Sequence, residues 1–166
     1  MKKLSLILVL VSCLVLVAGG AFGATATQNL TINATVSSVA TLTLSTNTNN
    51  FPNADPDVTG SIPATENAVT VTVKGRTGAG STVTLTHRAG GDLTSGSDTI
   101  AIGNVTWTAT GAGFAAGTMS SGADVPAGSW TGPGNHPGTF SYFLANSWAY
   151  AMGNYTVSST YTLTVP

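Results

Sequence analysis

The chain has 166 residues, of which only 7% are charged, and a formal net charge of −1. Lys2 and Lys3 are the first charged residues, and the rest of the chain carries three basic against six acidic residues. There is therefore no basic patch to neutralise nucleic-acid phosphates or an anionic membrane surface, and nucleic acid is excluded as a partner. A single cysteine, Cys13, also excludes an intramolecular disulfide.

Residues 1–23 are typical of a secretory signal peptide. Met1-Lys2-Lys3 precedes an apolar run over residues 4–17, and small residues follow up to Gly23. We expect cleavage there and export through the periplasm, to a secreted or extracellular cell-surface location. The apolar run is short for a membrane span, and no later stretch approaches one, so no transmembrane segment is expected. The alternative is a lipid anchor at Cys13, although apolar residues continue after it.

The next segment alternates as a β-strand does. Within residues 28–36, every second position after Gln28 is apolar and the positions between are Asn or Thr. The apolar positions are Leu30, Ile32, Ala34 and Val36. Ser37-Ser38 then breaks the pattern. We therefore divide the chain into a signal peptide (1–23), an N-terminal extension (24–38) and a β domain (39–166).

The rest of the chain also follows a period of two. Alternation predicts strands over residues 39–45, 68–74, 81–87, 98–102 with 104–110, 139–144 and 154–165. The strands at 68–74 and 81–87 are expected to form a hairpin. No window shows a helical period, so the fold class is all-β, an immunoglobulin-like β-sandwich, with a barrel as the alternative. These six main strands are one short of a seven-stranded sandwich.

The last predicted strand is the most regular. Its apolar face carries Tyr155, Val157, Tyr161, Leu163 and Val165, and threonines occupy most of the opposite face. Neither this strand nor residues 28–36 contains a charged residue, although soluble β proteins usually protect edge strands with charge or proline. Two solutions remain open: the N-terminal strand pairs within its own domain, or it pairs with a neighbouring copy.

Aromatic residues suggest one ligand site. Residues 111–138 are rich in Gly, Ala, Ser and Pro, and we expect either one or two weak strands there or a binding loop. Trp130 is the best candidate for an exposed ring that could contact a glycan or another ligand. Trp107, Tyr142 and Trp148 are expected to pack in the core instead.

The residues of a catalytic or metal site are not found together. No cysteine follows Cys13, and no serine lies in a Gly-x-Ser-x-Gly arrangement. His87, expected at a surface strand end, and His136, expected in a turn, are too few for zinc. Asp55 and Asp57 lack the ordered ligand ladder of a calcium loop. We therefore expect no enzyme, no catalytic residues, no cofactor and no metal.

Both ends of the chain resemble a known family. A signal peptide, an alternating segment, a two-serine break and Val-Ala-Thr-Leu-Thr-Leu stand in that order, and Gly153-Asn154-Tyr155-Thr156 leads into the Thr-rich last strand. This order is similar to that of chaperone–usher-type pilins, most closely the archaic, spore-coat-U-like branch. The chain differs from that branch in lacking a cysteine in its first strand.

The resemblance implies a function. In such pilins the sandwich lacks one strand, and the N-terminal segment of the next subunit fills the groove after a periplasmic chaperone and an outer-membrane usher have handled the subunit. By that resemblance residues 30–36 would donate, and the apolar residues of 155–165 would line the acceptor. We expect a structural subunit of a cell-surface filament (a homo-polymer). The alternative is a monomeric surface sandwich that binds glycan through Trp130.

Overall fold

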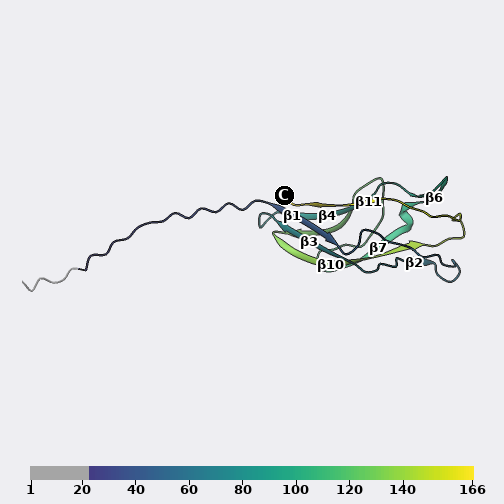
Figure 1. Ribbon diagram of the computed structural model, residues 1–166, viewed down its shortest axis with the longest axis horizontal. Coiled ribbons are helices and arrows are strands. Elements are labelled where there is room, and N and C mark those ends of the chain that lie inside the picture. Colours follow the sequence, from purple (N-terminus) through teal and green to yellow (C-terminus); the bar gives the residue numbers. More distant parts are fainter. Residues whose placement is uncertain (1–22) are drawn as a thin grey trace, which may run out of the picture. The chain divides into compact units, whose positions relative to one another are not determined.

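The computed structural model of the chain describes residues 23–166 (Figure 1). The predicted signal peptide, apart from Gly23, and the anchor at Cys13 lie outside the described residues. The chain separates into two units, Met1–Thr35 and Val36–Pro166, which we describe individually. No helix within residues 23–166 is long and apolar enough to cross a membrane.

The described part of the first unit contains no regular structure. Residues 23–35 belong to no helix or strand, and their side chains are exposed. Leu30 and Ile32 are each 84% exposed. The strand predicted over residues 28–36 is therefore not formed in the single chain. A strand needs a partner for its backbone groups and a cover for its apolar face, so alternation alone cannot hold it.

The second unit is all-β, as predicted. Its strands are β1 (Val39–Leu44), β2 (Ser61–Pro63), β3 (Val69–Arg76), β4 (Thr82–Ala89), β5 (Leu93–Ser95), β6 (Asp98–Ile100), β7 (Val105–Thr110), β8 (Gly117–Thr118), β9 (Val125–Thr131), β10 (Gly134–Ala145) and β11 (Ser159–Thr164). One 3₁₀ turn, Ile102–Asn104, separates β6 from β7.

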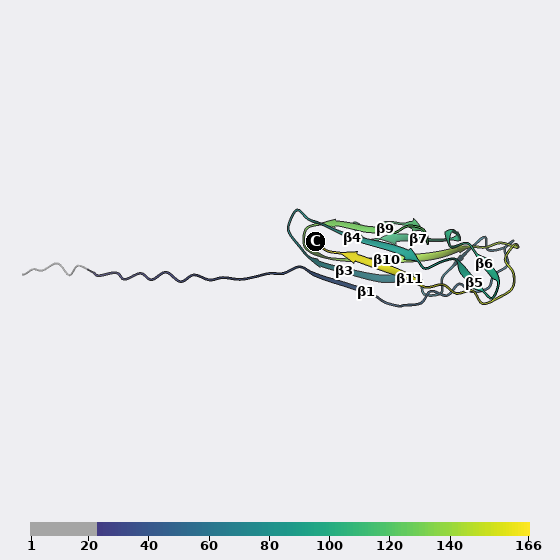
Figure 2. The same ribbon diagram turned by 90° about the horizontal axis from the view of Figure 1, so that it is seen from above.

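Two antiparallel sheets form a sandwich. The first has the order β1-β3-β10-β7-β8, with β2 paired to the end of β10, and the second has the order β11-β4-β9. In Figure 1 the layer of β4 and β11 lies above the layer of β3 and β10, and Figure 2 shows the same strands from above. A separate hairpin joins β5 to β6. The path of the first large sheet therefore ends at β1 and β8, and the second ends at β11 and β9.

The predicted hairpin between β3 and β4 is wrong. β3 pairs with β1 and β10, whereas β4 pairs with β11 and β9, so the turn between them crosses from one sheet to the other. Val73 on β3 and Leu85 on β4 are both 0% exposed. The buried face of β3 is apolar and that of β4 is apolar except for His87, and two such faces bury more surface by facing each other than by lying side by side.

The core lies between the sheets and includes most of the large residues. Trp107 and Tyr142 are 2% and 4% exposed, which confirms their predicted packing, and Phe140 is fully buried beside them. Trp148, however, is 70% exposed, so the expectation that it packs in the core is wrong. The reason is local: the indole nitrogen donates to Asp57 Oδ1 (3.0 Å), which holds the ring outward.

Residues 111–138 contain two weak strands, β8 and β9, and the beginning of β10. Here the structure agrees with the prediction of weak strands rather than with that of a long binding loop. The last strand is shorter than predicted, because residues 154–158 contribute only the single bridge between Thr94 and Thr156 before β11 begins at Ser159.

Candidate functional site: an open groove between β1 and β11

One side of the sandwich is closed by hydrogen bonds. β8 pairs with β7, and the residues before it reach across to β9 of the other sheet. The backbone nitrogen of Ala115 donates to Ala127 O (2.9 Å), and that of Ser129 donates to Gly113 O (2.9 Å). These backbone hydrogen bonds join the two sheets along this side.

The opposite side is open. β1 is the edge of the first sheet and β11 is the edge of the second, and within residues 23–166 no ladder joins them. β1 pairs only with β3 and β11 pairs only with β4, so each keeps one backbone edge without a partner strand. Uncharged edges of this kind are templates for a further strand.

Side-chain burial shows the same opening. On β3 and β4 the inward residues are fully buried, whereas the inward residues of β1 and β11 are only half-buried. The half-buried side chains are Leu42, Leu44, Tyr161, Leu163 and Val165, and Tyr155 and Val157 extend the row before β11. A side chain on the inner face of a sandwich normally loses its exposure, so these residues lack a cover on one flank.

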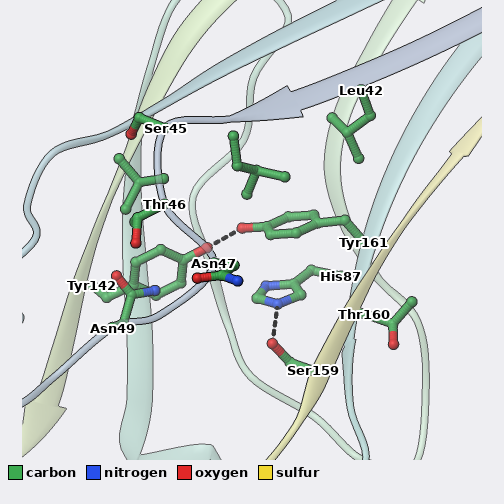
Figure 3. Close-up of a pocket in the computed structure, with 12 residues that line it drawn as sticks. Leu42, Ser45, Thr46, Asn47, Asn49, His87, Tyr142, Ser159, Thr160 and Tyr161 are labelled. Carbon is green, nitrogen blue, oxygen red and sulfur yellow. Dashed lines mark hydrogen bonds between the residues drawn. The ribbon is translucent and has the colours of Figure 1, made fainter.

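A cavity of about 650 Å³ occupies the space between the two edges. Its apolar and aromatic lining comes from Leu42, Leu44, Val69, His87, Tyr142 and Tyr161, and the other lining residues carry hydroxyl or amide groups. No lining residue is charged. Figure 3 shows the side chains of Leu42, Tyr161 and His87 directed into this space from β1, β11 and β4.

The floor of the cavity is a stack of rings joined by hydrogen bonds. His87 and Tyr161 are parallel, with ring centroids 3.8 Å apart and an interplanar angle of 10°. The hydroxyls of Tyr161 and Tyr142 form a hydrogen bond, and His87 Nε2 lies 3.0 Å from Ser159 Oγ (Figure 3). His87 is 2% exposed, so its predicted place at a surface strand end is wrong, because its ring lies between the sheets against Trp107, Tyr142 and Tyr161.

Burial keeps these groups neutral. It lowers the pKa of His87 to about 4 and raises the pKa of Tyr142 to about 12. The pKa of Tyr161 is raised still further, first by burial and then by its neighbour Tyr142. At neutral pH the floor therefore presents uncharged rings and hydroxyls.

The pairing of His87 with Ser159 does not make an activated nucleophile. A histidine with a pKa of about 4 is a weak proton acceptor at neutral pH. Its Nδ1 is buried and has no hydrogen-bond partner, so no third group orients the ring. Residues 23–166 also contain no group of three His, Cys, Asp or Glu side chains arranged to hold a metal ion. The cavity offers apolar contact, and the edges of β1 and β11 offer backbone pairing.

The structure gathers the predicted acceptor residues on one edge, with Tyr161, Leu163 and Val165 on β11 or directly after it. The opposite wall of the groove is formed by Leu42 and Leu44 on β1, which were not predicted as site residues. The alternation of residues 39–45 was the signal that could have indicated them. It also missed the floor residue His87, which no local pattern could place. The predicted donors Leu30 and Ile32 belong to the first unit.

Trp130 is not the exposed ring that was expected. It is 7% exposed, it stacks on His136 with ring centroids 5.0 Å apart, and its indole nitrogen donates to Ala112 O (2.7 Å). The prediction that Trp130 offers a free face to a ligand is wrong, because the segment before β8 folds over it and closes the sandwich there.

Comparisons of the chain with protein-family models, curated proteins and solved structures gave no match.

Proposed function

We propose that this chain is the exported structural subunit of a cell-surface filament, and that residues 28–36 of one copy fill the groove between β1 and β11 of another. The single observation that carries the proposal is this groove, which has two free, uncharged backbone edges and a row of half-buried apolar side chains. A strand laid there would complete an immunoglobulin-like sandwich and satisfy both edges.

The N-terminal extension has the matching properties. Leu30, Ile32, Ala34 and Val36 share one face of an extended chain and no charge interrupts them. Residues 30–36 would span roughly 20 Å as a strand, which suits the six-residue edges of β1 and β11. Leu30 and Ile32 are each 84% exposed in the single chain, so burying them in a groove recovers apolar surface.

A filament follows from the connectivity. Each copy carries both the extension and the groove, so each can donate to one neighbour and accept from another. The export signal predicted for residues 1–23 places this assembly outside the cytoplasm, and the pilin resemblance supplies a periplasmic chaperone and an outer-membrane usher as partners. The glycan-binding alternative loses its support, because Trp130 is buried.

A charge placed on the donor face tests the proposal. In mature protein we expect Ile32→Asp to abolish filaments, seen by electron microscopy, and the SDS-resistant ladder on unboiled gels. Thr31→Asp, which puts the same charge on the opposite face of the strand, should leave both intact. Filaments that form equally well with Ile32→Asp would refute strand donation. So would a wild-type protein that stays monomeric while unfolding cooperatively.

A further inference from the structure

Two tyrosine hydroxyls at the floor of the cavity are each other's only partners. Tyr142 Oη and Tyr161 Oη form one hydrogen bond, and within residues 23–166 neither hydroxyl has a second partner. Each hydroxyl carries one hydrogen and can both donate and accept. One of the two hydrogens makes the bond between the oxygens, so the other has no acceptor in the protein. Both tyrosines line the cavity, so the missing acceptor must come from an occupant.

The second hydrogen stays on its oxygen at neutral pH. Burial raises the pKa of Tyr142 to about 12. The pKa of Tyr161 is raised still further, first by burial and then by Tyr142. An occupant of the cavity therefore meets a neutral hydroxyl donor.

His87 does not accept this hydrogen. Its Nε2 pairs with Ser159 Oγ (3.0 Å), and its Nδ1 is buried without a partner. The imidazole lies parallel to the ring of Tyr161, with centroids 3.8 Å apart. The hydroxyl oxygen of Tyr161 lies in the plane of its own ring, whereas the imidazole lies over that ring's face (Figure 3).

A donated strand does not supply the acceptor either. The residues that it would turn into the groove have no polar side-chain atom: Leu30, Ile32, Ala34 and Val36. Its backbone oxygens point sideways, toward the edges of β1 and β11, as in any sheet. The strand would cover the tyrosine pair and leave one hydroxyl hydrogen without a partner.

The rest of the lining defines the body of an occupant. Leu42, Leu44 and Val69 offer apolar contact, and the volume of about 650 Å³ lies within the range of small-molecule pockets. No lining residue is charged. A charged occupant would therefore lose its hydration without meeting a counter-ion.

We propose that the cavity between β1 and β11 is also the binding site of a small uncharged molecule that has an apolar body and a carbonyl oxygen. The carbonyl oxygen accepts the free tyrosine hydrogen. A carbonyl fits this place better than a hydroxyl does, because it accepts without bringing a further hydrogen that needs an acceptor of its own.

The bound molecule and a donated strand exclude each other, because both need the space between the two edges. This competition rests on the strand donation proposed above, whereas the binding itself does not. A free molecule of this class at ten times its Kd raises the apparent Kd of the strand about elevenfold by mass action. The same groove therefore allows a small molecule to oppose polymerisation.

Acetophenone and α-methylstyrene test the carbonyl, because they have the same shape and differ in one atom group, C=O against C=CH₂. Calorimetric titration of mature Ile32→Asp, whose own extension cannot occupy a groove, measures both affinities. We expect acetophenone to bind at least about tenfold more tightly, since it satisfies a buried hydroxyl. Benzoate, of similar shape but charged, should not bind. Equal affinities for acetophenone and α-methylstyrene, or no binding of acetophenone, would overturn the proposal.

Phenylalanine substitutions locate the donor. Tyr161→Phe should keep the preference for acetophenone, because the hydrogen of Tyr142 is then free to donate. Tyr142→Phe combined with Tyr161→Phe should reduce the affinity ratio to about one. Leu42→Phe, on the half-buried edge β1, narrows the cavity and should weaken both molecules, which tests the location even if the double variant does not fold. A preference for acetophenone that survives the double substitution, or full affinity in Leu42→Phe, would place the ketone elsewhere.

Displacement of a peptide of residues 28–36 tests the competition. In mature Ile32→Asp, acetophenone at ten times its Kd should raise the Kd of the wild-type peptide about elevenfold. An unchanged Kd of the peptide would show that the two occupants do not share the groove. A peptide that never binds, while acetophenone does, would refute strand donation and leave the small-molecule site standing.

Discussion

Tyr161 on β11 stacks on His87 on β4, with ring centroids 3.8 Å apart and the rings within 10° of parallel. This pair joins the edge strand to the core of its sheet and forms the floor of the groove. The histidine also contacts Trp107 and Tyr142, neither of which carries a charge at neutral pH. The groove therefore depends on a histidine that must remain neutral.

Acid should destabilise the domain through His87. Its pKa is lowered to about 4, from about 6.5 in the unfolded chain, so the unfolded state binds more protons between these values. Stability is unaffected above about pH 6.5 and falls as the pH drops toward 4, by about 3 kcal/mol in all. Denaturant unfolding at several pH values should show this loss.

His87→Phe is the matched variant for that titration, because it keeps a ring in the stack and cannot be protonated. Its unfolding free energy should vary less between pH 6.5 and 4 than that of the wild type, with the carboxylates contributing equally to both. Parallel curves for the two proteins would contradict the neutral, buried state of His87.

The acceptor edge should tolerate charge on one face only. Leu163 is half-buried and faces the groove, whereas its neighbour Thr162 is exposed on the other face of β11. Leu163→Asp should fold, with a loss of about 1–2 kcal/mol, and fail to polymerise, because the charge lies where the donated strand must pack. Thr162→Asp should polymerise normally. Electron microscopy and unboiled gels measure both outcomes, and filaments of Leu163→Asp would count against this edge as the acceptor.

A peptide should replace the missing strand. Protein without residues 24–36 keeps an empty groove, and a synthetic peptide of residues 28–36 should bind there and raise Tm. At a concentration 100 times Kd the expected stabilisation is about 2.7 kcal/mol. A peptide with Ile32→Asp is the control and should leave Tm unchanged. Equal shifts with both peptides would indicate binding outside the groove.

The closed side should depend on Gly113. This residue has a φ of 83°, and an added Cβ would collide with the Trp130 indole and lie 2.7 Å from Ser129 O. Gly113→Ala should therefore cost about 2 kcal/mol or more of unfolding free energy, through backbone strain and lost packing. Gly103→Ala is the control, because nothing lies within 4 Å of its Cβ position and φ is not positive. Chemical denaturation compares the two, and similar losses would contradict this account of the closure.

The sequence by itself determined the all-β class and the position of most strands. Alternation in residues 39–45, 68–74 and 81–87 reports which face of a strand is buried, and a strand's face is a local property. It also singled out the apolar row from Tyr155 to Val165, which the structure places along the open edge. The shared face of Leu30 and Ile32 could likewise be identified from alternation, although the strand predicted there is not formed in the single chain.

Only the tertiary structure decided which strands are neighbours and which edges stay open. β3 and β4 look like a hairpin in sequence yet belong to opposite sheets, because pairing is a choice between distant partners. The same holds for two of the tryptophans: Trp130 is buried by a segment that folds over it, and Trp148 is held outward by the bond from its indole nitrogen to Asp57. Burial depends on what the rest of the chain brings alongside, and no local pattern contains that information.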